Sequence, residues 1–276
     1  MPGLGVRLPE GSPPRVVGLV VTAPISLCCH RRNFIYRVMP AIVAAAVDLP
    51  VSAHALSLHS DRSEAADHAA SFLAGTPPEE SASYWVSDPS LVAYYNDRLA
   101  DVAPDQIGCV HVLAHEQVDR VDGKLRPTEE VIDFVSAHPH GVTAGGETLS
   151  EYWTPATIPE HMEYEAWFAD QPRDASRFLC PYDLRRLPPD QAPYIMRELG
   201  KHHSHVVLSD SRDPAVRLIQ LFVFSTPAEL PPVQRETLAW ATEGGLVRTF
   251  GPHEEFTITR EGAELFQTWA GAVVLD

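Results

Sequence analysis

The stretch Arg177-Phe-Leu-Cys-Pro-Tyr-Asp183, followed after a segment of helical length by His202-His-Ser-His-Val-Val-Leu-Ser-Asp210, decides the fold. Two short apolar runs, 178–180 and 206–208, flank the helical segment, which is typical of a strand–helix–strand unit in a parallel sheet. Polar residues follow each run, and ligands of open α/β proteins bind at the carboxyl edge of the sheet. The polar residues that we therefore expect to collect at this edge are Cys180, Tyr182, Asp183, His202 and His203.

The rest of the chain alternates strands and helices in the same way. Alternating and apolar runs predict strands at 54–59, 83–87 and 108–113, and helical spacing predicts helices that begin near Asp61, Pro89 and Pro127. The run Gly-Val-Thr-Ala-Gly-Gly at 141–146 is interpreted as a flexible loop or a short strand around Val142, and 159–168 as a helix. The alternation predicts an α/β fold with a mostly parallel sheet flanked by helices.

The sequence predicts three parts. Residues 1–50 form a leader, either disordered or upstream of the true start, residues 51–225 form the α/β domain, and residues 226–276 form a separate small α+β unit. In the small unit a helix, two strands and a second helix follow one another, an order that resembles the end of a winged-helix domain. The proline-rich run 226–232 leaves little room for the helix-turn-helix that precedes a complete wing. We therefore expect an abbreviated winged-helix-like unit.

Composition is typical of a globular cytoplasmic protein. The chain has 276 residues, of which 45% are hydrophobic, and four cysteines without a C-x-x-C pair, which favours a reducing compartment. No apolar run reaches the roughly 18 residues that cross a bilayer, so no membrane partner is expected. The formal net charge of −16 repels phosphate backbones, which disfavours DNA as a partner of the small unit.

The turn after the strand at 54–59 lacks the features of a nucleotide-binding loop. It reads Ser60-Asp-Arg-Ser-Glu64, with no glycine and no P-loop lysine, and its acidic groups repel phosphate. We therefore expect a degenerate phosphate loop and no cofactor. No metal is expected either, because His202, His203 and His205 have no other ligand residues beside them in the sequence.

Two other functions stay open at this point. Cys180 with His202 or His203 could form a thiolate pair if the side chains meet in space, which would make the protein an enzyme. Against this, a cysteine that ends a buried strand usually serves as a small core residue. The second alternative is a direct DNA-binding transcriptional regulator that uses the small unit.

Several short motifs together resemble the MEDS domain, the DcmR-like sensory domain of methanogen and methylotroph regulators. The motifs are residues 54–59 with the following Ser-Asp-Arg-Ser-Glu, Gly146-Glu147, Tyr164-Glu165, Leu179-Cys-Pro-Tyr-Asp183 and His203-Ser-His-Val-Val207. The resemblance covers about residues 52–212. Its most specific part is Leu-Cys-Pro-Tyr-Asp together with the upstream Tyr-Glu.

The resemblance implies a RecA/KaiC-like core and a non-enzymatic sensory or regulatory function. The ligand would be a small organic molecule, and binding would pass a signal to transcription or to a protein signalling partner. We also expect a homo-oligomer. The residues expected to bind the ligand, with Trp153 as an apolar wall, are Glu147, Trp153, Tyr164, Glu165, Cys180, Tyr182, Asp183 and His203.

Overall fold

A seven-stranded parallel sheet forms the centre of the protein. The computed structural model describes residues 42–112, 120–121, 124–126, 129–147, 156–171, 175–224, 226–251 and 255–273, all within one compact unit, Val38–Asp276. The strand order is β1-β9-β2-β8-β7-β3-β4, and every neighbouring pair is parallel, so the predicted α/β fold is confirmed. The closer likeness to RecA and KaiC stays a prediction. The strands are β1 Ile42–Val43, β2 His54–His59, β3 Ser81–Val86, β4 Val110–Val112, β7 Val142–Gly146, β8 Arg177–Asp183 and β9 His205–Val207.

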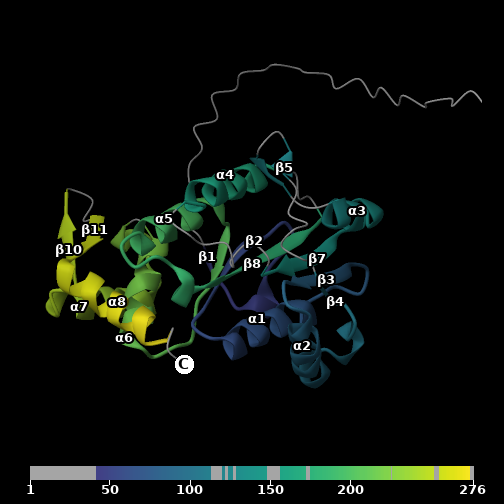
Figure 1. The fold of residues 1–276 in the computed structure, drawn as a ribbon, viewed down its shortest axis with the longest axis horizontal. Coiled ribbons are helices and arrows are strands. Elements are labelled where there is room, and N and C mark those ends of the chain that lie inside the picture. The colour runs from purple at the N-terminus through teal and green to yellow at the C-terminus, as the bar shows by residue number, and fades with distance from the viewer. Residues whose placement is uncertain are drawn as a thin grey trace, which may run out of the picture. The chain divides into compact units, whose positions relative to one another are not determined.

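Helices cover both faces of the sheet, and the direction of each crossover decides the face (Figure 1). The connections from β2 to β3 and from β3 to β4 run one way along the sheet, whereas those from β4 to β7, β8 and β9 run back. Because crossovers between parallel strands are right-handed, the two directions place helices on opposite faces. One face carries α1 Arg62–Ala74 and α2 Pro89–Val102, and the other carries α3 Glu129–Ala137, α4 Ile158–Ala169 and α5 Ala192–His202.

Local sequence explains where the first helices begin. The Asp61 carboxylate accepts a hydrogen bond from Glu64 N at 2.9 Å and caps α1. Asp88 caps α2 through Ser90 N at 2.8 Å, and Pro89 occupies the first turn, where its missing N–H has no consequence. The helix starts predicted at these residues are therefore confirmed.

The C-terminal segment packs on the α5 face and shares its core with the α/β part. The predicted order of helix, hairpin and helix is confirmed, whereas the winged-helix likeness stays a prediction. Phe256 and Phe266 are buried in the same apolar core as Phe222 and Leu199 of α5, so residues 226–273 do not form a separate core. The elements are α6 Pro214–Gln220, the 3-10 turns Leu221–Val223 and Pro227–Glu229, α7 Pro232–Glu243, β10 Val247–Phe250, β11 Glu255–Ile258 and α8 Arg260–Val273.

Residues 42–50 belong to the folded unit, although the predicted leader extends to residue 50. β1 pairs with β9 at one edge of the sheet, and Ile42 lies opposite His205. The 3-10 turn Ala46–Asp48 follows, and Ala46 is buried in the core that α1 lines. The prediction is wrong for this stretch, because partners far along the chain order it rather than any local pattern. Residues 1–41 lie outside the described residues.

β7 is a central strand, which corrects the interpretation of 141–146 as a flexible loop. Val142–Gly146 is hydrogen-bonded to β3 on one side and to β8 on the other. A Cβ on Gly145 would lie 2.9 Å from Leu179 O and 3.0 Å from the Tyr84 ring, so glycine permits the close approach of these strands. The short-strand alternative is therefore correct, and the glycines serve packing.

Gly200→Ala is expected to destabilise the protein by about 1–3 kcal/mol, the usual cost of overpacking. A Cβ on Gly200 in α5 would lie 2.2 Å from Val223 O, whereas a Cβ on Gly271 in α8 would meet no atom within 4 Å. Gly271→Ala is therefore the matched control and is expected to add about 0.4–1 kcal/mol. Urea unfolding measures both changes. Equal midpoints for the two variants would contradict the close packing of α5 on the 221–223 turn.

Candidate functional site

A histidine and a cysteine meet inside the domain on the face that α4 and α5 cover. His54 begins β2, and Cys180 lies on the neighbouring strand β8 opposite Leu56. Because side chains alternate along a strand, His54, Leu56 and Cys180 point to the same face. His54 Nε2 lies 3.2 Å from Cys180 Sγ on that face. The two residues are 126 positions apart in the sequence, and only the strand register brings them together.

Helices α4 and α5 supply two further ionisable side chains. Glu165 belongs to α4, and His203 directly follows α5 as its C-terminal cap. Glu165 Oε2 lies 3.6 Å from Nε2 of His54 and 3.6 Å from Nε2 of His203. His54, Glu165 and His203 are buried, and Cys180 is partly buried. One donor atom from each of these residues lies within 4.8 Å of all the others, and we call the four residues the buried cluster.

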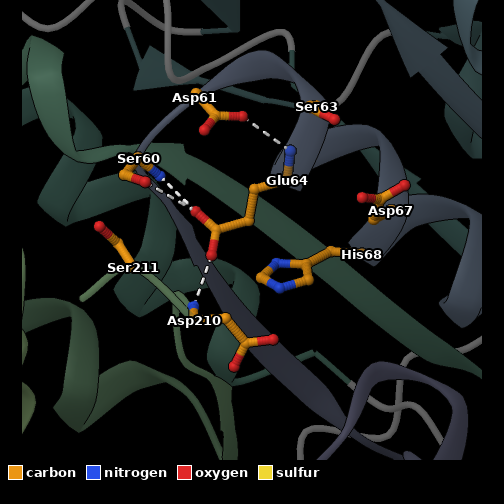
Figure 2. Close-up of a pocket in the computed structure, with 8 residues that line it drawn as sticks. All are labelled: Ser60, Asp61, Ser63, Glu64, Asp67, His68, Asp210 and Ser211. Atoms are coloured by element: carbon orange, nitrogen blue, oxygen red, sulfur yellow. Dashed lines mark hydrogen bonds between the residues drawn. The ribbon is translucent and has the colours of Figure 1, made fainter.

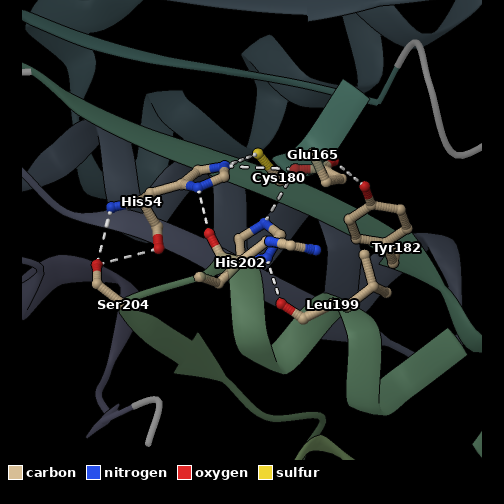
Figure 3. A network of polar contacts seen from close by, with 8 residues as sticks. His54, Glu165, Cys180, Tyr182, Leu199, His202 and Ser204 are labelled. Atoms are coloured by element: carbon tan, nitrogen blue, oxygen red, sulfur yellow. Dashed lines mark hydrogen bonds and ion pairs between the residues drawn. The ribbon is translucent and has the colours of Figure 1, made fainter. Parts of the chain in front are cut away.

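Backbone carbonyls of α5 fix the orientation of both imidazoles. His54 Nδ1 lies 2.9 Å from His202 O (Figure 3), and His203 Nδ1 lies 2.7 Å from Leu199 O. A carbonyl oxygen only accepts hydrogen bonds, so each Nδ1 is the donor and carries a proton. In the neutral ring the Nε2 lone pair then faces the centre of the buried cluster.

Tyr182 and an aromatic residue of α4 enclose the buried cluster. The Tyr182 hydroxyl donates a hydrogen bond to Glu165 Oε1, while Oε2 is the oxygen near the histidines (Figure 3). Burial, followed by the charges of Glu165 and Cys180, raises the pKa of Tyr182 well above its ordinary value, so the hydroxyl stays a donor. The Phe168 ring lies 4.9 Å from the His54 ring, measured between centroids.

The donor atoms of the buried cluster allow two kinds of chemistry. Thiolate sulfur, imidazole nitrogen and carboxylate oxygen are the ligands that zinc takes in proteins. Among the described residues, this is the single group of His, Cys, Asp and Glu side chains arranged closely enough to hold a metal ion. His54 beside Cys180 is also the arrangement of a thiol nucleophile with a general base.

The structure brings several of the predicted ligand residues together. Glu165, Cys180 and His203 belong to the buried cluster, and Tyr182 binds it directly. Tyr164 lies nearby, because its ring stacks on that of Phe168, with 6.0 Å between centroids, and Phe168 lies beside the His54 ring. Burial, followed by the charges of Glu165 and Cys180, raises the pKa of the Tyr164 hydroxyl well above its ordinary value.

The other predicted ligand residues lie elsewhere. Asp183 ends β8 at the carboxyl edge of the sheet, where its carboxylate is 2.7 Å from the Arg185 guanidinium. That neighbour lowers the pKa of Asp183 in spite of burial. Glu147 follows the last residue of β7 at the same edge. Trp153 lies outside the described residues.

The buried cluster lies near the amino ends of β2 and β9, whereas Cys180 and His203 were expected at the carboxyl edge of the sheet. Helix α5 begins after the carboxyl end of β8 and returns along the sheet, so His202 and His203 stand at the start of β9. A crossover between parallel strands always returns the chain to the starting edge. The expectation for His202 and His203 was therefore wrong.

His54 is the residue of the buried cluster that sequence reasoning missed. It was predicted as the first residue of a strand and lay in a motif of the MEDS resemblance, but it was not named as a site residue. No metal was expected because the histidines near residue 203 lacked companions in the sequence. A histidine that opens an otherwise apolar buried strand is the signal that could have identified it. The His54 side chain is 1% exposed, and a buried polar group needs polar partners.

A separate open pocket occupies the carboxyl edge of the sheet (Figure 2). The Glu64 carboxylate accepts hydrogen bonds from Ser60 N and Ser209 Oγ, each at 2.7 Å, and so ties the turn after β2 to the segment after β9. The acidic lining stands where a phosphate loop would supply glycines and a lysine. The pocket measures about 320 Å³ and is lined by Ser60, Asp61, Ser63, Glu64, Asp67, His68, Asp210 and Ser211.

Comparison of the chain with protein-family profiles, with curated proteins and with solved structures gave no match. The likeness to the MEDS domain therefore stays a prediction that rests on the motifs alone. Among the helices of the described ranges, none has both the length and the apolar character of a membrane span.

Proposed function

We propose that this chain is a non-enzymatic sensory or regulatory protein and that the buried cluster is its sensing site. One observation carries the proposal. The two imidazoles of the buried cluster bind carbonyls in the last turn of α5, and the same helix binds the C-terminal hairpin of β10 and β11. A ligand that rearranges the buried cluster would therefore act on the helix that holds the hairpin.

Arg197 is the contact between α5 and the hairpin. Its guanidinium donates a hydrogen bond to Phe256 O on β11. It also lies over the rings of Phe222 and Phe256, at 5.3 and 5.9 Å from their centroids. Leu199, whose carbonyl accepts the hydrogen bond from His203 Nδ1, packs in the same apolar core as both rings. A shift of α5 would therefore change how the hairpin packs.

The ligand class and the output expected from the sequence are parts of the same proposal. The motif resemblance supports a small organic molecule as the signal and transcription or a protein partner as the target. The core shared between α5 and residues 226–273 supports an output through the C-terminal segment.

Glu165→Gln is expected to speed hydrogen exchange of the β10 and β11 amides by about tenfold, which corresponds to about 1.4 kcal/mol of local stability. The change keeps the side-chain shape and removes the charge that lies 3.6 Å from both imidazoles. Mass spectrometry of exchanging peptides measures the effect. The α1 amides on the opposite face of the sheet are expected to exchange as before.

Arg197→Leu provides the control for this experiment, because it removes the hydrogen bond to Phe256 O. In the Arg197→Leu background, Glu165→Gln is expected to leave hairpin exchange unchanged. We call the proposed coupling from the buried cluster through α5 to the hairpin the relay. If Glu165→Gln alone speeds hydrogen exchange in α5 but leaves exchange in the hairpin unchanged, the relay is refuted.

An enzyme that uses Cys180 is a second candidate, favoured by the 3.2 Å between Cys180 Sγ and His54 Nε2. The base would be His54 in place of the predicted His202 or His203. Fast alkylation of Cys180 by iodoacetamide at neutral pH, slowed in His54→Gln, would support this candidate, and an unreactive thiol would exclude it. Cys109 is the internal control, since burial raises the pKa of its thiol to about 11.

A further inference from the structure

We infer that the buried cluster binds one Zn²⁺ ion through His54 Nε2, His203 Nε2, Cys180 Sγ and Glu165 Oε2. The inference puts a metal ion in place of the small organic molecule as the ligand of the sensing site, and it rests on the proposed function for the role of that site. No metal was expected from the sequence, because His202, His203 and His205 have no other ligand residues beside them there. Four properties of the donor atoms support the ion: their spacing, their orientation, their charge and their chemical type.

The spacing of the donor atoms fits tetrahedral coordination. An ion with bonds of about 2.1 Å separates its tetrahedral ligands by about 3.4 Å. Three separations around the buried cluster are close to this value: 3.2 Å from His54 Nε2 to Cys180 Sγ, and 3.6 Å from Glu165 Oε2 to each Nε2. All four donor atoms lie within 4.8 Å of one another, so small side-chain shifts would complete the tetrahedron.

The orientation of the donor atoms is set by hydrogen bonds of the kind that support metal ligands. A histidine that binds zinc through one ring nitrogen usually donates the other N–H to a carbonyl or a carboxylate. His54 and His203 both do so, toward His202 O and Leu199 O. The Tyr182 hydroxyl holds Glu165 Oε1 in the same way and directs Oε2 to the centre.

Charge balance supports a divalent cation. A thiolate from Cys180 and a carboxylate from Glu165 together offset the two positive charges of the ion, so the filled site is neutral. Neutrality matters here because Glu165 is 1% exposed, and a buried charge is costly unless it is paired. Two neutral imidazoles complete the set without adding charge.

The type of the donor atoms distinguishes zinc from other common ions. Magnesium and calcium take oxygen ligands, often with several waters, whereas sulfur and imidazole nitrogen favour zinc. Four protein ligands also leave no open position for a substrate, which is typical of zinc sites that stabilise or regulate a fold. A closed site agrees with the proposed non-enzymatic function. The ion would join β2, β8, α4 and the end of α5.

The test uses the full chain, stripped of metal by a chelator and then titrated with Zn²⁺ or Co²⁺. We expect one Zn²⁺ per chain, and for Co²⁺ the visible absorption of tetrahedral coordination with a near-ultraviolet thiolate-to-cobalt band. Cys180→Ser is expected to remove the thiolate band. His203→Gln should weaken Zn²⁺ binding by more than about 100-fold, and Tyr182→Phe, which removes only a supporting hydrogen bond, by about 10–100-fold.

Glu64→Gln is the matched control, because Glu64 lies in the acidic pocket at the other edge of the sheet and its loss is expected to leave Zn²⁺ affinity unchanged. The inference is overturned if the wild-type chain binds no Zn²⁺ at micromolar concentration, or if binding survives both Cys180→Ser and His203→Gln. The buried cluster would then be a structural network of polar side chains that holds no metal ion. The cobalt spectrum of the wild-type chain decides the matter even if a variant fails to fold.

Hydrogen exchange separates this inference from the proposed function. If Zn²⁺ does not bind but Glu165→Gln still alters hairpin exchange in the metal-free chain, the regulatory proposal stands and the zinc inference fails. If Zn²⁺ binds and hairpin exchange is the same with and without it, the zinc site stands and the relay fails.

Discussion

Arg177→Met is expected to lower the free energy of unfolding by about 3–5 kcal/mol, the cost of removing one partner of a buried ion pair. The side chains of Arg177 and Glu80 are each 4% exposed and lie 3.5 Å apart. The guanidinium also donates hydrogen bonds to Thr143 Oγ1 and Leu49 O, each at 2.9 Å, and to Gly75 O. Without it, the Glu80 carboxylate stays buried and loses its ion pair. Denaturant unfolding measures the loss.

A second substitution separates the causes of this loss. Arg177→Met combined with Glu80→Gln is expected to recover about 1–3 kcal/mol, because the buried charge is then gone. Arg186→Met is the control, since the Arg186 side chain is 42% exposed and lies 3.7 Å from Asp183. An exposed pair contributes at most about 1 kcal/mol. A loss below that value for Arg177→Met would contradict the buried ion pair.

Lowering the pH from 7 to 4 is expected to remove about 3 kcal/mol of stability through His59 alone. Burial, opposed in part by Asp183, lowers the pKa of the His59 imidazole from 6.5 to about 4. Above pH 6.5 the ring is neutral in the folded and in the unfolded chain. Between pH 6.5 and 4 only the unfolded chain takes up the proton, so the free energy of unfolding falls as the pH falls.

His59→Gln isolates this contribution. The variant is expected to lose less stability than the wild type between pH 6.5 and 4. The slope of its unfolding free energy against pH should be smaller by the equivalent of up to one bound proton. His140→Gln is the control, because His140 is exposed and its ring meets solvent in both states. Chemical unfolding at several pH values measures the slopes. If His59→Gln and the wild type show the same slope of unfolding free energy against pH, His59 takes up a proton as readily in the folded chain as in the unfolded chain.

The alternation of strands and helices was predictable from the sequence because its signals are local. Residues 54–59 form β2 as predicted, because their alternation fits the two-residue period of a strand. The strand ends before Asp61, which caps α1. The helix predicted at 159–168 is α4, Ile158–Ala169. Each of these predictions depends on neighbours within a few positions.

Long-range pairing was not predictable, and the site depends on it. His54 and Cys180 meet because β2 pairs with β8, a choice that the two sequences alone do not specify. Glu165, Cys180, Tyr182 and His203 were named as one site from their motifs, but His54 was not, and the edge of the sheet was misjudged. β7 was obscured because its glycines, which permit close strand contact, are also typical of loops.

The place of β9 between β1 and β2 governs the order in which a nascent chain can fold. β1 is synthesised early, yet its hydrogen-bonded partner is β9, the last strand of the large sheet. Until β9 has emerged from the ribosome, β2 forms an open edge of the sheet in the nascent chain. Exposed edges are prone to pair with other chains. Completing β9 closes this edge and delivers His203 in one late step. Protection against aggregation and assembly of the buried cluster therefore begin together during synthesis.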